Sequence, residues 1–476
     1  MPLDRKIAFI DLTAGKIKVK PIPVALRRKF LGGRGINMHL LSRHYTPSLN
    51  PFSPDNPLIF GAGFLTGCLS FGSRLSITSK SPESGHLGDS NMGGDFGAEL
   101  VKAGFSHVVI SGKSPNPVYI VIQDNQIEIR DAKKLTGLDT IETQKRLRSA
   151  LKDDKVQIAC IGPAGENLVR FAAIRSGMKS SAGRTGMGAV MGSKNVKALA
   201  VRGTRDIKLS APKKYLSYYL ATMKSLAGTK WAQALGKYGT PLLFSRANAL
   251  GILSIRNNQS TSVGDQGYRL AAEALEPYST GMLACFSCPV HCRHRFVIEK
   301  GKYQGTRGEG PEYGSIGSLG SKLGNLDLEN SMYAIELCNR YGLDTISTGS
   351  YIAWAMELYQ RGIIDQKATK RPLVCSLFHV GSVNPKKSAI RIKKDDLTTS
   401  MNMPILCRQC KEMKCLPGEK AEGEGEKKKF IWDTSSAGRC PFGALPVFDN
   451  KAFHCDLCQG KPQCVKVCTT QAISVR

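Results

Sequence analysis

The chain has 476 residues, of which 41% are hydrophobic and 22% charged. These values are ordinary for a globular protein of about three domains and exclude a disordered or fibrous chain. No segment approaches the roughly 20 consecutive apolar residues that a membrane helix needs, and the N-terminus lacks the apolar core of a signal peptide. We therefore expect a cytoplasmic protein with no membrane span.

The formal net charge is +29, with an excess of +15 in residues 1–208, +4 in residues 209–366 and +10 in residues 367–476. We find no recognition-helix pattern and no aromatic-basic RNA motif, so we expect no nucleic-acid partner. Phosphorylated cofactors and anionic metal clusters explain the excess at least as well. Fifteen cysteines in a cytoplasmic chain indicate metal ligation or redox chemistry rather than disulfides.

Residues 1–208 predict strands separated by glycine loops, with few helices. Asp124 and Asn125 lie between two alternating runs and predict a hairpin turn. The clearest helical segments are residues 97–102 and 141–151. The predicted strands are residues 7–12, 16–22, 57–61, 107–112, 118–122, 126–130, 156–162 and 196–201.

Residues 209–366 predict a helical second domain. Helices are expected over residues 215–226 and 332–341, the second ended by Gly342 as a left-handed cap. Thr345 is expected to cap a further helix that Gly362 closes. Beyond residue 366 the chain changes to short segments rich in cysteine and lysine, with a solvated loop at residues 418–429. The expected fold class is a multidomain α+β protein.

Nine cysteines follow residue 366, and their spacing indicates iron-sulfur clusters. One loop supplies three thiolates to a cubane and a distant residue supplies the fourth, often before a proline, as in Cys440-Pro441. Zinc ribbons are the alternative, but they favour two CxxC pairs some 15 to 20 residues apart. The nine are Cys375, Cys407, Cys410, Cys415, Cys440, Cys455, Cys458, Cys464 and Cys468.

The segments CRQCKEMKC, CPFGAL and CDLCQGKPQCVKVC resemble the multi-cubane ferredoxin-type subunits that accompany molybdenum and tungsten enzymes. The resemblance implies a bacterial ferredoxin-like domain in residues 367–476 with two complete 4Fe-4S clusters. It leaves Cys468 without family partners. The implied ligand sets are Cys407, Cys410, Cys415 and Cys440 for one cluster and Cys375, Cys455, Cys458 and Cys464 for the other.

A third constellation, ACFSCPVHCRHRF, places Cys285, Cys288 and Cys292 within eight residues. Three thiolates at this spacing fit one corner of a cubane. Zinc bound with His291 or His294 and buried unligated cysteines are the alternatives.

Residues 5 to about 364 resemble the aldehyde ferredoxin oxidoreductase family of tungsten and molybdenum enzymes. The resemblance rests on FLGGRGINMHLL, SRLSITSKSPESGHLGDSNMGGDFGAELVKAGF, GRTGMGAVMGSKNVKALAV, the cysteine loop, GPEY and LCNRYGLDTISTGSYIAWAMELY. It implies a sheet-rich, pterin-binding N-terminal domain. Glycine-rich loops that carry donors suit pterin phosphates, although each loop alone fits a tight turn better. The implied donors are Arg34, Arg74, Asn91, Arg184, Lys194 and Asn195.

Residues 339–344 match the family's DxxGL(C/D) pterin motif, with asparagine in the first place. The resemblance therefore implies pterin contacts for Asn339, Gly342, Leu343 and Asp344. Glu312 in GPEY matches a carboxylate that the family places near the metal, where it could accept a proton. A surface glutamate on a glycine-rich loop is an equal alternative.

Family members are longer, and the expected third domain with its second DxxGLC motif, active-site histidine and fourth cluster cysteine is not found in this sequence. We therefore expect the cluster at Cys285, Cys288 and Cys292 to have three cysteine ligands. Cys338 and Cys468 are candidates for the fourth.

The resemblance implies oxidation of an aldehyde to a carboxylate at a tungsten or molybdenum pterin, with electrons passing through 4Fe-4S clusters. Mg²⁺ at the pterin phosphates is compatible with it. The expected partner is ferredoxin or another redox subunit, and the sequence leaves the oligomeric state open. The alternative is a non-catalytic electron-transfer protein that carries an inactive oxidoreductase remnant.

Overall fold

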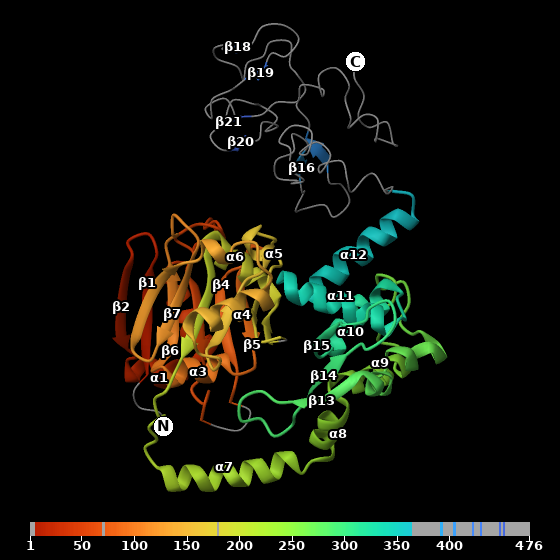
Figure 1. The fold of residues 1–476 in the computed structure, drawn as a ribbon, viewed down its shortest axis with the longest axis horizontal. Coiled ribbons are helices and arrows are strands. Elements are labelled where there is room, and N and C mark those ends of the chain that lie inside the picture. Colours follow the sequence, from red (N-terminus) through yellow and green to blue (C-terminus); the bar gives the residue numbers. More distant parts are fainter. Residues whose placement is uncertain are drawn as a thin grey trace. The chain divides into compact units, whose positions relative to one another are not determined.

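The computed structural model describes residues 5–68, 72–178 and 180–363, together with short strand pairs between residues 391 and 452 (Figure 1). It divides into two compact units, Met1–Trp354 and Ala355–Arg476. The cysteines predicted to hold the two ferredoxin-type clusters lie outside the described residues, and their ligation stays a prediction. The short pairs are β16 (Arg391–Lys393) with β17 (Met403–Ile405), β18 (Ala421–Glu422) with β19 (Lys429–Phe430), and β20 (Val447–Phe448) with β21 (Lys451–Ala452).

The first of two six-stranded sheets has the strand order β2-β1-β6-β3-β4-β5. β1 and β6 are parallel and all other pairs are antiparallel. All four strands predicted here are confirmed, whereas β4 and β5 were missed. β4 is buried on both faces and β5 is polar, so neither alternates clearly. The strands are β1 (Lys6–Asp11), β2 (Lys16–Pro21), β3 (Leu58–Ala62), β4 (Leu75–Lys80), β5 (Leu87–Met92) and β6 (Phe105–Ser111).

The second sheet has the order β11-β10-β9-β12-β7-β8, with only β12 and β7 parallel. The four predicted strands are confirmed, and Asp124, with φ of 49°, lies in the predicted turn between β7 and β8. The strands are β7 (Val118–Gln123), β8 (Gln126–Asp131), β9 (Gln157–Cys160), β10 (Ile174–Ser176), β11 (Ser180–Ala182) and β12 (Val196–Arg202).

Side chains from both sheets form one apolar core together with α3 and α6. α2 covers the other face of the first sheet and α4 that of the second. Each fully buried Phe, Leu or Ile in these layers contributes roughly 1.5–3 kcal/mol. The helices of this region are α1 (Val24–Phe30), α2 (Gly33–Leu41), α3 (Phe96–Lys102), α4 (Thr140–Leu151), α5 (Pro163–Glu166) and α6 (Met187–Ser193).

Residues 209–363 are mainly helical, as predicted, but they also contain a three-stranded sheet that the sequence did not reveal. Its strands are short and the cysteine loop interrupts them, which hides their alternation. The elements are α7 (Pro212–Ala227), α8 (Lys230–Tyr238), α9 (Leu243–Ala249), α10 (Tyr313–Leu319), α11 (Leu328–Tyr341), α12 (Thr345–Gln360), β13 (Ser279–Leu283), β14 (Arg293–Val297) and β15 (Arg307–Glu309).

The α11–α12 connection fastens the helical region to the N-terminal domain. Gly342 has φ of 72° and caps α11 as predicted. Its carbonyl accepts the Ala173 N–H at 2.8 Å, and the Asp344 N–H donates to the Phe171 carbonyl at 3.1 Å. The predicted cap of α12 is off by one residue, because the Asp344 carboxylate accepts the first N–H groups of the helix while Thr345 lies inside it.

In the part of the chain described above, no helix is both long and apolar enough to cross a bilayer.

Candidate functional site

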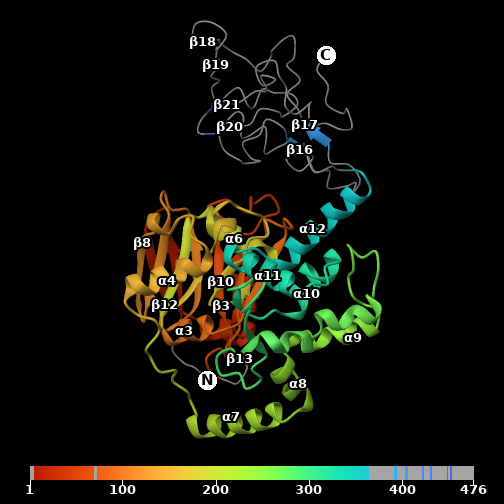
Figure 2. The same ribbon diagram turned by 45° about the vertical axis from the view of Figure 1, so that its right-hand side comes forward.

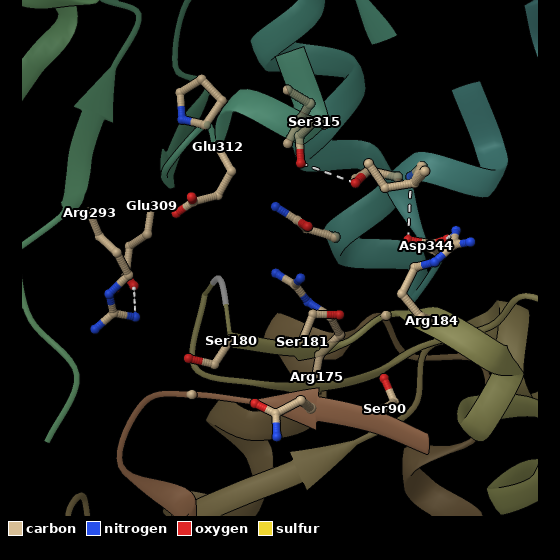
Figure 3. A pocket seen from close by; sticks show the side chains of 18 of the residues that line it. Ser90, Arg175, Ser180, Ser181, Arg184, Arg293, Glu309, Glu312, Ser315 and Asp344 are labelled. Carbon is tan, nitrogen blue, oxygen red and sulfur yellow. Dashed lines mark hydrogen bonds and ion pairs between the residues drawn. The ribbon is translucent and has the colours of Figure 1, made fainter. Parts of the chain in front are cut away.

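A cavity of about 520 Å³ lies between the N-terminal domain and the helical region (Figure 3). It gathers most residues that the family resemblance implied, although they come from segments far apart in the sequence. The predicted residues that line it are Arg74, Asn91, Arg184, Cys285, Cys292, Glu312, Asn339, Leu343 and Asp344. Gly342 and Cys288 are not among its lining residues.

The N-terminal wall of the cavity carries three guanidinium groups. Arg74 precedes β4, and its side chain forms no hydrogen bond or ion pair with any described residue. Arg175 on β10 is only 3% exposed, and burial lowers its pKa to about 10. One of its terminal nitrogens donates to the Met178 carbonyl, while its Nε is buried without a partner. This wall can therefore receive an anionic group.

Arg184 is already paired within the protein. It donates to the Asp344 carboxylate at 2.7 Å and to the Ser347 hydroxyl at 3.1 Å. Its side chain is 57% exposed, whereas that of Asp344 is 5% exposed. Arg184 and Asp344 thus both line the cavity as the motifs implied, and they also hold the two regions of the protein together.

The opposite wall carries carboxylates at the ends of elements. Glu312 immediately precedes α10 and is half-buried at the cavity, so it does not lie on an open surface loop. The Thr240 hydroxyl donates a short hydrogen bond to its carboxylate and accepts the Tyr313 N–H at 3.1 Å. This contact fixes the Glu312 carboxylate, which Figure 3 shows at the cavity.

The cysteine loop lies directly against the N-terminal domain. A Cβ added to Gly93 would stand 3.1 Å from the Cys285 sulfur, and the Phe286 N–H donates to the Gly94 carbonyl at 3.3 Å. Ser287 and His291 have positive φ, which turns the loop tightly. A side chain at position 93 would require the Cys285 sulfur to shift by a few tenths of an ångström.

Burial raises the pKa of the Cys288 thiol, and the neighbouring Cys285 and Cys292 raise it further, while the backbone N–H groups of Val290 and His291 oppose that rise. Hydrogen bonds to sulfur are a usual means of tuning iron-sulfur clusters. The Arg293 guanidinium closes the base of the loop through the Ala284 carbonyl and pairs with Glu309 at 3.1 Å.

The hydrogen bonds of the two histidines do not separate the cluster and zinc alternatives. His291 Nδ1 contacts the Pro289 carbonyl at 2.9 Å and His294 Nδ1 contacts the Ser279 hydroxyl at 3.0 Å, and a ring held in this way can still ligate a metal through Nε2. Throughout the described ranges, no three His, Cys, Asp or Glu side chains converge as ligands of one metal ion, and this includes the three thiols of the loop. Buried unligated cysteines are a poor description, because all three thiols are partly exposed, unlike Cys160 and Cys338.

Three of the predicted donors do not reach the cavity. Lys194 is fully buried and donates to the Pro54 and Gly112 carbonyls, which makes it a structural residue. Asn195 donates to the Ser114 carbonyl at 2.6 Å. Arg34 is paired with Asp89 at 2.6 Å.

Sequence reasoning missed four charged residues that line the cavity: Asp89, Arg175, Arg293 and Glu309. The sequence did contain an indication of Arg175, because it is the one charged residue in the apolar segment FAAIRSG. Arginines are almost never fully buried unless they are paired, so a single arginine in such a segment indicates a binding or structural partner. Nothing in the sequence indicated Arg293 and Glu309 as neighbours, because the β14–β15 pairing that brings them together was not predicted.

Comparison with known families agrees with these motifs. Residues 7–203 match the aldehyde ferredoxin oxidoreductase N-terminal domain, and residues 218–376 match domains 2 and 3 of the same enzymes. Over these residues the chain belongs to the aldehyde ferredoxin oxidoreductase family.

Curated relatives include a tungsten-containing aldehyde ferredoxin oxidoreductase from Pyrococcus abyssi, 42% identical over 366 residues. That match covers 76% of this chain and 59% of the relative, so the chain spans about three fifths of the relative's length. In Pyrococcus furiosus, the WOR-like subunit of an aliphatic sulfonate oxidoreductase is 32% identical over 382 residues, covering 76% of this chain and 60% of the subunit.

The polyferredoxin-like subunit of that sulfonate oxidoreductase is also similar, with 31% identity over 108 residues, covering 20% of this chain and 61% of the subunit. Among solved structures, the active-site complex BamBC of benzoyl coenzyme A reductase superimposes with a TM-score of 0.68 at 28% identity. It covers 77% of this chain and 57% of the other.

Proposed function

We propose that this chain is an oxidoreductase of the aldehyde ferredoxin oxidoreductase type, which oxidises an aldehyde to a carboxylate at a tungsten or molybdenum pterin. The observation that carries the proposal is the cavity itself. It gathers Arg74, Arg175, Cys285, Cys292 and Glu312, which come from segments far apart in the sequence, around one space.

The residues present fit an anionic pterin. The Arg175 Nε is buried with no hydrogen-bond partner, and the Arg74 side chain is unpaired within the described residues. Arg175 is a desolvated cation with an unused donor, which is costly unless an anion completes it, whereas Arg74 is exposed and can turn toward a bound anion. Arg74, Arg175 and Asn91 would hold the phosphate and pterin groups, and the 339–344 segment would close the other side.

The bound metal pterin would supply the two-electron oxidation, and Cys285, Cys288 and Cys292 would supply thiolates to a 4Fe-4S cluster. Aldehyde and water yield carboxylate, two electrons and three protons. The Glu312 carboxylate is placed to accept one of these protons, and its hydrogen bond from Thr240 keeps it oriented for that transfer.

Residues 367–476 would form the ferredoxin-type domain with the two clusters named above. The similarity to a polyferredoxin-like subunit supports this assignment. Electrons would leave through these clusters to ferredoxin or to another redox subunit.

The decisive experiment is anaerobic purification from a host supplied with tungstate and molybdate. Metal analysis should find tungsten or molybdenum together with iron, and denatured protein should release pterin. Cys288→Ser should remove about four irons, whereas Cys160→Ala, which changes a buried thiol outside the cavity, should leave the iron content unchanged. Protein with iron but neither pterin nor tungsten or molybdenum would instead support the electron-transfer protein with an inactive remnant.

A further inference from the structure

α7 is a 16-residue helix with no buried residue. Large apolar side chains on α7 and α8 are open to solvent: Leu216 is 53% exposed, Tyr218 63%, Leu220 57% and Trp231 46%. Figures 1 and 2 both show α7 along the rim of the first unit, away from the two sheets. Such a face marks an interaction site more often than a chance arrangement.

The segment that contains α7 and α8 carries charged residues of one sign only. Residues 207–264 contain eight lysines and arginines and no aspartate or glutamate. Lys213, Lys214 and Lys224 on α7 are exposed, and none of them pairs with an acid among the described residues. Successive helix residues are about 100° apart, so Lys213, Leu216, Leu220 and Lys224 lie on one side of α7 and Tyr218 lies on the opposite side. We call this side of α7, together with α8, the basic face.

This face is continuous with the cysteine loop. The Tyr219 hydroxyl on α7 contacts the Ser287 hydroxyl at 3.0 Å. In α8, a Cβ at Gly236 would stand 2.8 Å from the Val290 carbonyl, so the helix backbone lies against the loop. Ser287 and Val290 flank Cys288, the one cysteine of the three that does not line the cavity.

Opposite sides of the loop thus serve different neighbours. Cys285 and Cys292 face the cavity, while the residues around Cys288 contact α7 and α8. An electron that leaves the loop away from the cavity therefore reaches the basic face first.

We propose that α7 and α8 form the docking surface for an acidic one-electron carrier protein, which takes electrons directly from the cysteine loop as a second exit beside the clusters of residues 367–476. The inference rests on the proposed function and extends it by naming the surface. Each oxidised carrier would accept one electron, so two carriers would account for the two electrons of one aldehyde oxidation. Complementary charge speeds the encounter and orients the carrier toward the loop.

Net charge also argues against two other occupants of this basic face. A second copy of this chain carries +29, and residues 367–476 carry +10, so neither complements a basic face. An anionic membrane would complement it, but a membrane does not explain why the face joins the cysteine loop.

The test uses the anaerobically purified full chain and, as probe, an acidic two-cluster ferredoxin. Interferometry should detect binding that weakens about tenfold or more as salt rises from about 50 to 500 mM. The triple variant Lys213→Glu, Lys214→Glu, Lys224→Glu should weaken binding about tenfold at low salt. Leu216→Ser with Leu220→Ser should weaken it several-fold at both salt concentrations.

The matched control is Lys16→Glu, Lys18→Glu, Lys20→Glu on the exposed strand β2, which changes the net charge equally. It should leave binding within about twofold. Carbodiimide crosslinking should join ferredoxin carboxylates to α7 lysines. Equal losses in both triple variants, or crosslinks centred on β2, would overturn the proposal.

Vesicles of phosphatidylserine and phosphatidylcholine test the membrane alternative. A carrier site would be refuted if the wild type bound these vesicles but not ferredoxin, and if the α7 triple variant lost vesicle binding. If pterin and cluster iron are present and ferredoxin does not bind, only the docking surface is wrong. If they are absent, the proposed function fails first and the docking proposal falls with it.

Discussion

Arg74, Arg175 and Arg184 reach the cavity from strands and their connections in the N-terminal domain, whereas Cys285, Cys292 and Glu312 reach it from loops and helix ends of the helical region. Asp89 and Arg293 add one opposite charge to each side. Arg175 lies on β10, which pairs with a strand on each side. Cys285 and Glu312 lie outside regular elements. Strands fix a charge through many backbone hydrogen bonds, while a loop can turn several thiols toward one point.

The difference follows the chemistry assigned to each wall. Phosphate binding needs donors at fixed positions, and a sheet supplies them. A cluster needs three thiolates from one short segment, and only an irregular backbone brings side chains eight residues apart onto one centre. The N-terminal wall should therefore tolerate change in its packing less well than the opposite wall.

The packing of α6 offers the largest expected effect. A Cβ at Gly192 would stand 2.0 Å from the Gly165 carbonyl oxygen. Gly192→Ala should thus cost about 3 kcal/mol or more of unfolding free energy, measured by urea titration. In the helical region, Gly317→Ala in α10 meets open space and should gain about 0.5–1 kcal/mol. Equal responses would show that the backbone contact at Gly192 is not what limits the substitution.

Glu336 on α11 predicts that the stability of the protein depends on pH. It is 8% exposed, and burial raises its pKa from 4.5 to about 7, against the fields of Arg175 and Arg340. Between these values the unfolded chain has lost a proton that the folded chain keeps, so stability should fall as pH rises and level off above about 7.

Glu336→Gln should abolish that loss and stabilise the protein at pH 8 by up to about 3 kcal/mol. Thermal unfolding at pH 5 and pH 8 measures it, with the exposed Glu142→Gln as control. An unchanged pH profile in Glu336→Gln would contradict the assignment.

Arg175→Met removes the buried cation of the N-terminal wall. Loss of a charge-assisted contact of about 1.5–3 kcal/mol should reduce the pterin retained by purified protein roughly ten- to a hundredfold. Pterin released on denaturation measures the effect, and Arg175→Lys should recover part of it. Full retention in the methionine variant would show that Arg175 has a structural role only.

Arg184→Ala should have the smallest effect of the series. Its side chain is 57% exposed and paired with Asp344, and such pairs contribute about 1 kcal/mol or less. We expect a loss of stability within that range and a reduction in pterin retention much smaller than for Arg175→Met. A larger loss of pterin than in Arg175→Met would reverse the ranking of the two arginines.

Local sequence determined much of the fold. Alternating apolar residues predicted eight strands that the structure contains, and Gly342 predicted the end of α11 because only a left-handed residue closes a helix in that way. The spacing of Cys285, Cys288 and Cys292 likewise placed a three-thiol loop, since ligands within one turn segment are encoded locally.

The tertiary structure alone decided which of the predicted residues share a site. Because Lys194, Arg34 and Arg74 all stand in glycine-rich motifs, the sequence predicted all three as cofactor-binding donors. In the structure, Lys194 is buried and donates to backbone carbonyls, and Arg34 pairs with Asp89. Arg175 and Glu336 gain their properties from burial, and Arg293 meets Glu309 through a strand pairing. Burial and pairing arise from contacts between distant segments, and a single sequence does not record which segments meet.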